Sequence, residues 1–219
     1  MKSTNTDQSK KIAQILLDIG AVTFSRNRPF KFDSGILSPV YVDNRILISY
    51  PKERKIVLKA LLSLIEAKTK PFDVVAGIAT AGIPHAAWIA QELNMPMIFV
   101  RSKPKEHGKG NQVEGKLKRG QKVLVVEDLI STAGSSVKVI EAIRSIGGIV
   151  QDEIAIYSHN LRESDKNINK TKVKLHYLTD TKTAAEVAEN QGFLKKDQVD
   201  VILTWVDNPQ NWAKKMGYE

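Results

Sequence analysis

Short apolar runs alternate with amphipathic segments from residue 74 onward, and this alternation limits the fold more than any other feature of the sequence. Within the runs, apolar and polar residues do not alternate, which indicates strands buried on both faces. We predict strands at Val74–Ala76, Met97–Val100, Val123–Val126, Ile149–Tyr157 and Val173–Leu178. Strands of this kind, separated by helices, form a parallel sheet with helices on both sides, so the expected class is α/β.

Helices are predicted where apolar residues recur three and four positions apart. The predicted helices are Gln8–Ile19, Pro51–Ala67, a segment ending near Leu93, Ser135–Ser145, a segment near Thr183–Asn190, and one at the C-terminus. Residues 22–48 differ, because aromatic, proline, glycine and aspartate residues dominate them. That composition predicts short extended pieces joined by turns at Asp33-Ser34-Gly35 and at Ser38-Pro39.

The composition is typical of one globular domain without disulfides. Hydrophobic residues make up 42% of the 219 residues, and cysteine is absent. The N-terminal residues lack the apolar core of a signal peptide, and no apolar stretch is long enough to cross a bilayer. We therefore expect one domain over residues 1–219, located in the cytoplasm and without a membrane partner.

The net charge of +9 suggests an anionic partner, and the basic residues are densest between residues 101 and 122. Nucleic acid is one class of partner for such a charge. However, aromatic residues make up only 6% of the chain, and none lies in this basic segment to stack on bases. A compact polyanion such as pyrophosphate explains the local charge equally well, and the remaining lysines fit a solvated surface. We expect no nucleic-acid partner.

Glu127 and Asp128 follow the apolar run Val123–Val126, and Ser131–Ser135 then leads into a predicted helix. Two adjacent carboxylates at a buried strand end are costly unless a ligand compensates them. A small, hydroxyl-rich turn at a helix N-terminus can direct N–H groups and hydroxyls at one anion. The plain alternative is a helix N-cap with surface acids beside it. Together the two features indicate a ligand with hydroxyls and a phosphate, such as ribose 5-phosphate.

Two further loops follow the predicted strands that end at Ala76 and Val100. Ligands of a parallel sheet bind at the carboxyl ends of its strands, so these loops belong to the same candidate site. Residues 77–84 are small and let a ligand approach the backbone closely, although an ordinary strand-to-helix turn favours small residues too. Residues 102–120 combine glycines and a proline with charges, as mobile lids do. Residues after Tyr157 carry no motif that indicates a site.

The run Val123–Ser135 resembles the phosphoribosyl-pyrophosphate binding motif of type I phosphoribosyltransferases. The resemblance implies their fold, a central parallel sheet flanked by helices with a small N-terminal hood, here mainly residues 20–48. It implies that the two acids accept hydrogen bonds from the ribose hydroxyls and that residues 131–135 bind the 5′-phosphate. The implied binding residues are Glu127, Asp128, Leu129, Ile130, Ser131, Thr132, Ala133, Gly134 and Ser135.

Two other loops narrow the resemblance to the orotate phosphoribosyltransferases. Residues 77–84 resemble their pyrophosphate loop, which assigns Thr80 and Ala81 to pyrophosphate and makes Ala79–Thr80 a candidate for a strained non-proline peptide. The pattern R-x-x-x-K-x-H-G in residues 101–108 resembles their lid, residues 102–120 here. The resemblance implies that Lys105 is catalytic and that Arg101 and His107 bind pyrophosphate. Because the family's lid reaches into the neighbouring subunit, it also implies a homodimer.

The stretch Phe32–Arg45 resembles the hood motif S-G-x-x-S-P-x-Y-x-D-x-R of the same family. It implies that backbone groups near Tyr41 and Val42 face orotate. Ser131 is assigned to orotate as well, because purine-specific members commonly carry an aspartate at that position.

Some family members contact orotate through a lysine at the position of Asp33. Lys31 and Arg45 are two candidate substitutes here, and the sequence does not rank them.

The resemblance implies transfer of the phosphoribosyl group from phosphoribosyl pyrophosphate to orotate, which gives orotidine 5′-monophosphate and pyrophosphate in pyrimidine synthesis. Mg²⁺ is expected as cofactor, bound mainly through the substrate and supported by Glu127 and Asp128 rather than by direct protein ligands. Two alternatives stay open: transfer to another base, and a non-catalytic nucleic-acid-binding regulator with the same fold.

Overall fold

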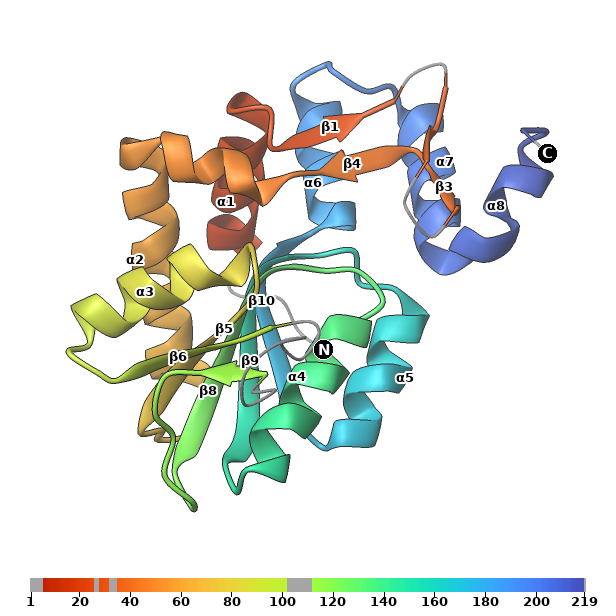
Figure 1. Ribbon diagram of the computed structural model, residues 1–219. Coiled ribbons are helices and arrows are strands. Elements are labelled where there is room, and N and C mark those ends of the chain that lie inside the picture. Colours follow the sequence, from red (N-terminus) through yellow and green to blue (C-terminus); the bar gives the residue numbers. More distant parts are fainter. Residues whose placement is uncertain (1–5, 26–27, 32–34, 102–111, 219) are drawn as a thin grey trace.

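The computed structural model describes residues 6–25, 28–31, 35–101 and 112–218. In this part of the chain, a six-stranded sheet has the order β10-β9-β8-β5-β6-β7 (Figure 1). Its strands are β5 (Val74–Ile78), β6 (Met97–Val100), β7 (Val113–Glu114), β8 (Lys122–Ile130), β9 (Ile149–Ser158) and β10 (Lys174–Asp180). Every neighbouring pair is parallel except β6 with β7. The predicted class and the mainly parallel sheet are confirmed.

Helices cover both faces of the sheet (Figure 1). One face carries α1 (Thr6–Asp18), α2 (Pro51–Lys68) and α3 (Gly82–Glu92), and the other carries α4 (Gly134–Ser145) and α5 (Arg162–Thr171). In β8, Leu124 and Val126 pack with the first group, whereas Val123 and Val125 pack with α4. Because successive residues of a strand face opposite sides, both sides of β8 must be apolar. This explains the unalternating run in the sequence.

The hood lies above the sheet in the view of Figure 1. It consists of two antiparallel pairs and a 3-10 helix: β1 (Val22–Phe24) with β4 (Val40–Val42), β2 (Phe30–Lys31) with β3 (Leu37–Ser38), and η1 (Asn44–Ser49). The predicted short extended pieces are therefore present. The predicted turn at residues 33–35 falls largely outside the described residues.

The C-terminal helices complete the upper part of the molecule in Figure 1. It contains α6 (Thr181–Asn190), α7 (Lys196–Asp207) and α8 (Pro209–Lys215). Helix α6 packs against α1, and α8 packs against β3 of the hood. The C-terminal helices thus contact both the first helix and the hood.

Three elements differ from the sequence prediction. Strand β8 continues through the two acids, because Leu129 and Ile130 keep the register with Tyr157 and Ser158 of β9. Strand β7 forms inside the segment expected as one loop, because Val113 pairs with Val100. Helix α5 was not predicted, because its sequence RESDKNINKT contains too few apolar residues to show a periodic pattern.

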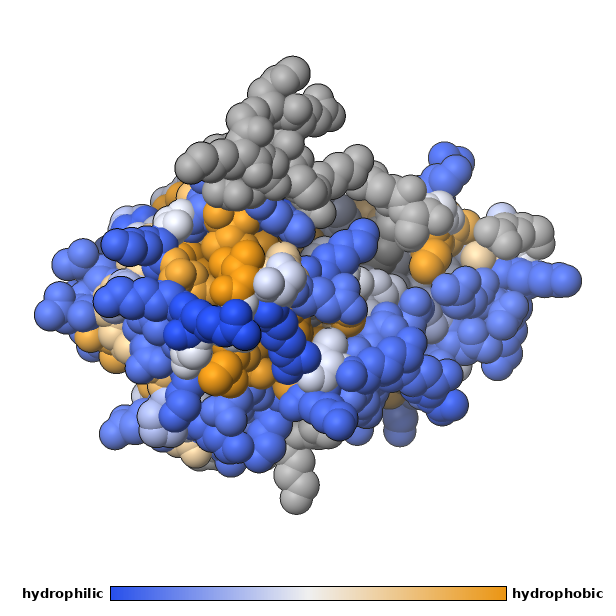
Figure 2. Space-filling model, turned by 60° about the horizontal axis from the view of Figure 1, so that its bottom comes forward, coloured by the Kyte–Doolittle hydropathy of each residue, from blue (hydrophilic) through white to orange (hydrophobic). Residues whose placement is uncertain are grey.

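Hydrophilic side chains cover most of the face shown in Figure 2, around a smaller apolar area. Among the helices of the described residues, none has the length and apolarity needed to cross a membrane.

Candidate active site

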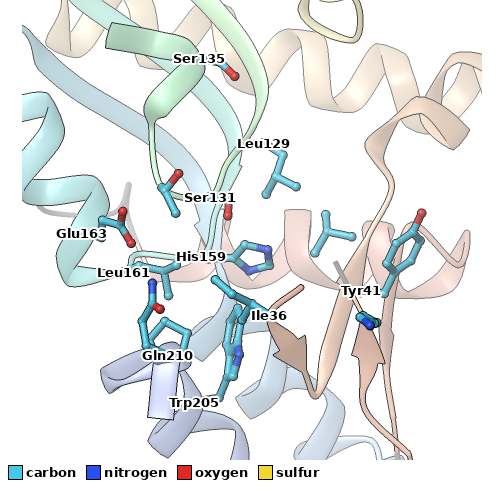
Figure 3. Close-up of a pocket in the computed structure, with 14 residues that line it drawn as sticks. Ile36, Tyr41, Leu129, Ser131, Ser135, His159, Leu161, Glu163, Trp205 and Gln210 are labelled. Atoms are coloured by element: carbon cyan, nitrogen blue, oxygen red, sulfur yellow. The ribbon is translucent and has the colours of Figure 1, made fainter. Parts of the chain in front are cut away.

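A pocket of about 810 Å³ lies between the carboxyl edge of the sheet, the hood and the C-terminal helices (Figure 3). The lining residues come from all three parts of the chain. They are Lys31, Ile36, Tyr41, Val42, Leu129, Ser131, Thr132, Ser135, His159, Leu161, Glu163, Trp205, Pro209 and Gln210. The pocket therefore joins the predicted phosphate loop (residues 131–135) to the predicted base-covering hood.

The acidic pair, Glu127 and Asp128, lies on β8 just before the phosphate loop. Glu127 is buried, and its Oε1 accepts a 3.0 Å hydrogen bond from the backbone N–H of Asp128. Burial raises the pKa of Glu127 well above its ordinary value, and the neighbouring Asp128 charge adds to this shift. Burial also raises the pKa of Asp128. Neither acid is among the residues that line the pocket, whereas the next residue, Leu129, is.

The acidic pair is suited to ligands that donate hydrogen bonds or carry positive charge, because either would offset the cost of burying the carboxylates. Among the described residues, no group of three or more His, Cys, Asp or Glu side chains is placed to hold a metal ion. The donor set therefore fits a cation that brings most of its oxygen ligands with it, as a phosphate-bound Mg²⁺ does.

The phosphate loop turns sharply into α4. Ala133 has a left-handed backbone conformation (φ 61°), and α4 begins at the next residue, Gly134. Asn167 of α5 donates a 2.9 Å hydrogen bond from Nδ2 to the carbonyl oxygen of Thr132 and so fixes the loop from outside. Ser135, in the first turn of the helix, is exposed and lines the pocket. An anion here would meet hydroxyls together with the positive end of the helix.

The pyrophosphate loop (residues 77–84) connects β5 to α3 beside the acidic pair. The Ala79–Thr80 peptide bond is cis, at the bond that the resemblance singled out. Thr80 is exposed and Ala81 is half-buried. A Cβ on Gly82 would lie 2.5 Å from the carbonyl oxygen of Val126 and 3.3 Å from Oε1 of Glu127, so only glycine allows α3 to start this close to β8.

Arg101 marks the base of the lid segment. Its backbone N–H donates to the carbonyl oxygen of Gln112 (3.0 Å), and its guanidinium lies 3.7 Å from Glu114. The backbone N–H of Ala79 donates to the carbonyl oxygen of Val100, which places the pyrophosphate loop next to Arg101. Lys105 and His107 lie outside the described residues.

The hood contributes Tyr41, Val42 and Lys31 to the pocket. Of the two candidate substitutes for the missing lysine, Lys31 lines the pocket. Arg45 is engaged elsewhere, with Nε 2.6 Å from Oδ1 of Asp43. This guanidinium lowers the pKa of the Asp43 carboxyl. The structure thus places Lys31 at the pocket and Arg45 in an ion pair, whereas the sequence did not rank these two candidates.

The remaining wall comes from residues for which no role was predicted from the sequence. Figure 3 shows His159, Leu161 and Glu163 opposite the hood, with Trp205 and Gln210 below them. The first three follow β9, so the rule about carboxyl ends of strands could have found them. Trp205 and Gln210 reach the pocket only because α7 and α8 pack beside the hood, and no local signal marks them.

Comparisons with known proteins agree with this geometry. Residues 49–191 match the family model described as "Phosphoribosyl transferase domain". The chain is 46% identical to an orotate phosphoribosyltransferase of Coxiella burnetii, over 94% of this chain and 99% of that protein. It is 45% identical to the one of Listeria monocytogenes, over 94% and 98%. A crystal structure of orotate phosphoribosyltransferase from Aeropyrum pernix superposes with a TM-score of 0.71 at 31% identity, over 84% of this chain and 99% of that one.

Proposed function

The chain belongs to the orotate phosphoribosyltransferase family, and from this premise we propose that it transfers the 5-phosphoribosyl group of phosphoribosyl pyrophosphate to orotate. N1 of orotate releases its proton to solvent and forms the new bond to C1′ as the bond from C1′ to pyrophosphate breaks. The products are orotidine 5′-monophosphate and pyrophosphate, in a step of pyrimidine synthesis. The observation that carries the proposal is the pocket, in which Thr132 and Ser135 of the phosphate loop share one cavity with Tyr41 and Val42 of the hood.

The sugar phosphate is assigned to β8 and α4. Thr132, Ser135 and the first turn of α4 bind the 5′-phosphate through hydroxyls and the positive end of the helix. Glu127 and Asp128 accept hydrogen bonds from the ribose hydroxyls. Burial raises the pKa of both acids and so favours their neutral form. Hydrogen bonds donated by the ribose hydroxyls would oppose this shift, because they stabilise the ionised carboxylates.

The leaving pyrophosphate is assigned to Thr80, Ala81 and Arg101, completed by Lys105 and His107 of the lid. Donors placed where negative charge develops stabilise the transition state. Magnesium, held mainly by substrate oxygens and water with the acidic pair in support, would neutralise charge on pyrophosphate.

Orotate is assigned to the part of the pocket between Ser131 and the hood residues Tyr41 and Val42. The orotate carboxylate needs a cation, and Lys31 is the cationic side chain among the described lining residues. We therefore assign the carboxylate to Lys31 rather than Arg45, whose guanidinium is paired with Asp43.

We further propose that residues 1–219 form one phosphoribosyltransferase domain that works as a homodimer, with the lid shared between subunits. Exposed apolar side chains of α2, α3 and their ends offer a contact surface. They are Tyr50 just before α2 (40% exposed), Ile56 in α2 (38%) and Leu93 just after α3 (37%). On the same two helices, Arg54 stacks 4.4 Å above the ring of Trp88. A cytoplasmic location belongs to this proposal, since a chain without cysteine has no need of an oxidising compartment.

The test of the reaction is the ultraviolet absorbance of orotate. We expect it to fall only when phosphoribosyl pyrophosphate and Mg²⁺ are both present, and we expect no turnover of adenine or hypoxanthine. Lys105→Ala should lower kcat at least a hundredfold, as loss of a transition-state donor does, while Lys109→Ala from the same segment should not. Turnover of a purine without turnover of orotate would reject the proposal.

The shared lid has its own test. Lys105→Ala removes the lid donor, and Asp128→Asn disables the sugar site. If the lid acts across the dimer, a mixture of the two inactive variants should regain activity, because a mixed dimer contains one intact site with one intact lid. A mixture that stays inactive although mixed dimers form would contradict sharing.

A further inference from the structure

Asn44 is buried where the hood meets the sheet. It is the first residue of η1, shortly after Val42, and it is completely inaccessible to solvent. Its Nδ2 donates a 2.8 Å hydrogen bond to the carbonyl oxygen of Asp128 in β8, 84 positions further along the chain. The orientation of the amide follows from this contact, because only its nitrogen can donate to a carbonyl oxygen. One side chain of the hood therefore holds the main chain of the acidic pair.

This contact lies where β8 has lost the partner strand on one side. The pairing of β5 with β8 ends at Gly77 and Val126. Beyond that point a main-chain carbonyl group needs another donor, and Asn44 provides one for Asp128. The backbone N–H of Asp128 is engaged as well, by Oε1 of Glu127 at 3.0 Å. The peptide groups on both sides of Asp128 are thus held, which fixes the direction in which its side chain leaves the strand.

Asn44 makes this contact at a cost. Its Oδ1 is buried and has no hydrogen-bond partner among the described residues. An unpaired acceptor in the interior is unfavourable, and a leucine of similar size would avoid it. Local choices that work against stability are expected mainly at functional sites. A buried amide that uses its nitrogen on the acidic pair and leaves its oxygen unpaired therefore indicates a role in the site.

The next residue of the hood acts on the same carboxyl group. Burial raises the pKa of Asp128, and the positive charge of Arg45 opposes this shift. Arg45 is itself held by Asp43, with Nε 2.6 Å from Oδ1. Two successive residues of the hood thus influence Asp128, Asn44 through the main chain and Arg45 through its charge.

Building on the proposed function, we infer that Asn44 is a positioning residue, which holds Asp128 so that its carboxylate meets the ribose hydroxyls. The same contact couples the hood to the sugar site, because Tyr41 and Val42 shortly precede Asn44 and line the pocket. A movement of the hood that displaces η1 would also turn Asp128. Asn44 itself does not touch the substrate.

A thermodynamic cycle tests this role, with ribose 5-phosphate as the probe and binding measured by calorimetry. We expect Asn44→Leu to weaken binding about fivefold, the effect of one lost hydrogen bond. In the Asp128→Ala background the same substitution should have no further effect, because the carboxylate that Asn44 positions is absent. The melting temperature of Asn44→Leu should change little, because one unpaired polar atom, Oδ1 of Asn44, is exchanged for another, the carbonyl oxygen of Asp128.

Asn167→Leu is the matched control. Nδ2 of Asn167 also donates to a main-chain carbonyl oxygen, that of Thr132 in the phosphate loop, at 2.9 Å. Its effect on ribose 5-phosphate binding should be the same with and without the Asp128 carboxylate, because it acts on the phosphate loop instead. Unchanged affinity of Asn44→Leu overturns the inference. An equal loss for Asn44→Leu in both backgrounds overturns it too, because a merely structural role would produce that result.

A second measurement uses the wild-type protein and needs no variant to fold. The side-chain ¹H–¹⁵N signals of Asn44 report on its hydrogen bond to Asp128. We expect them to shift when ribose 5-phosphate binds and to shift less with inorganic phosphate, which fills the phosphate loop without contacting Asp128. Signals that respond equally to both probes, or to neither, overturn the inference.

Failure of the proposed function would give a different result. If Asp128→Ala binds ribose 5-phosphate as tightly as the wild-type protein, the sugar does not lie at the acidic pair, and the assignment of the sugar site is overturned. If Asp128→Ala loses affinity while Asn44→Leu does not, only the positioning role of Asn44 is overturned.

Discussion

The indole Nε1 of Trp205 donates a 3.0 Å hydrogen bond to the carbonyl oxygen of Leu37, which ties α7 to strand β3 of the hood across 168 positions of sequence. Trp205 is completely buried, and its ring also meets that of His159. One side chain therefore connects the hood with the opposite wall of the pocket. The position of the hood beside the pocket depends on this contact between distant parts of the chain.

Trp205→Phe should raise KM for orotate while leaving KM for phosphoribosyl pyrophosphate nearly unchanged. The variant keeps an aromatic ring against His159 but leaves the Leu37 carbonyl without its donor, which costs about 1–3 kcal/mol. Steady-state kinetics with each substrate varied in turn would measure the effect.

Trp212→Phe is the matched control, because Nε1 of Trp212 donates to the carbonyl oxygen of Val201 at 3.1 Å, an acceptor in α7 rather than in the hood. Its melting temperature should fall by a similar amount without the change in KM for orotate. Equal changes in KM for both variants would show that the Trp205 effect is a general loss of stability.

Lys31→Met should raise KM for orotate about tenfold. This factor corresponds to the lower end of the free-energy range for a hydrogen bond to a charged group, because Lys31 is exposed to solvent. Arg45→Met should have little effect on that constant, because the Arg45 guanidinium is paired with Asp43. Methionine keeps the apolar stem in both variants, so only the charge is removed. The reverse result, with Arg45→Met the more damaging, would transfer the carboxylate to Arg45.

Gly82→Ala should disrupt the pyrophosphate loop. The new Cβ would lie 2.5 Å from the carbonyl oxygen of Val126, so the start of α3 must move away from β8 and carry Thr80 and Ala81 with it. Such overpacking costs about 1–3 kcal/mol, or several degrees in melting temperature for a chain of this size. KM for phosphoribosyl pyrophosphate should rise as well.

Gly134→Ala is the control for this prediction. A Cβ on Gly134 meets only Oγ1 of Thr132, at 3.8 Å. Thermal denaturation should therefore show little loss for Gly134→Ala. If both alanine variants melt at the wild-type temperature, the close approach of α3 to β8 does not constrain position 82.

Glu153 should make stability depend on pH. It is fully buried on β9, its Oε1 accepts a 2.7 Å hydrogen bond from the hydroxyl of Ser136, and burial raises its pKa from 4.5 to about 7. Between these two pH values the unfolded chain has released this proton while the folded protein still holds it. Stability therefore falls as pH rises through this window, by on the order of 3 kcal/mol, and levels off above it.

Glu153→Gln removes the titration and keeps an acceptor for Ser136. We expect the melting temperature of the variant, relative to wild type, to be several degrees more favourable at pH 8 than at pH 5. The comparison between the two pH values cancels any constant cost of the amide. A difference that does not change with pH would mean that Glu153 is not the group responsible.

Much of the site could be predicted because its signals are local. The apolar run before Glu127, the acidic pair and the small hydroxyl-rich turn before α4 are contiguous, and strand ends in a parallel sheet meet at one edge. In this region the structure differs from the prediction only in details, such as the continuation of β8 to Ile130. Helix α5 escaped prediction because its polar sequence carries no periodic pattern, although Asn167 within it holds the phosphate loop.

By itself, the sequence determined the α/β class, the parallel strands and the loops proposed to bind the sugar phosphate, because local patterns of apolar, small and acidic residues decide them. Only the tertiary structure decided that Lys31 rather than Arg45 lines the pocket, that His159 and Trp205 form its far wall, and that Glu153 is buried. Those outcomes depend on how the hood, β9 and α7 pack against one another. Packing between residues more than a hundred positions apart leaves no trace in any local window of the chain.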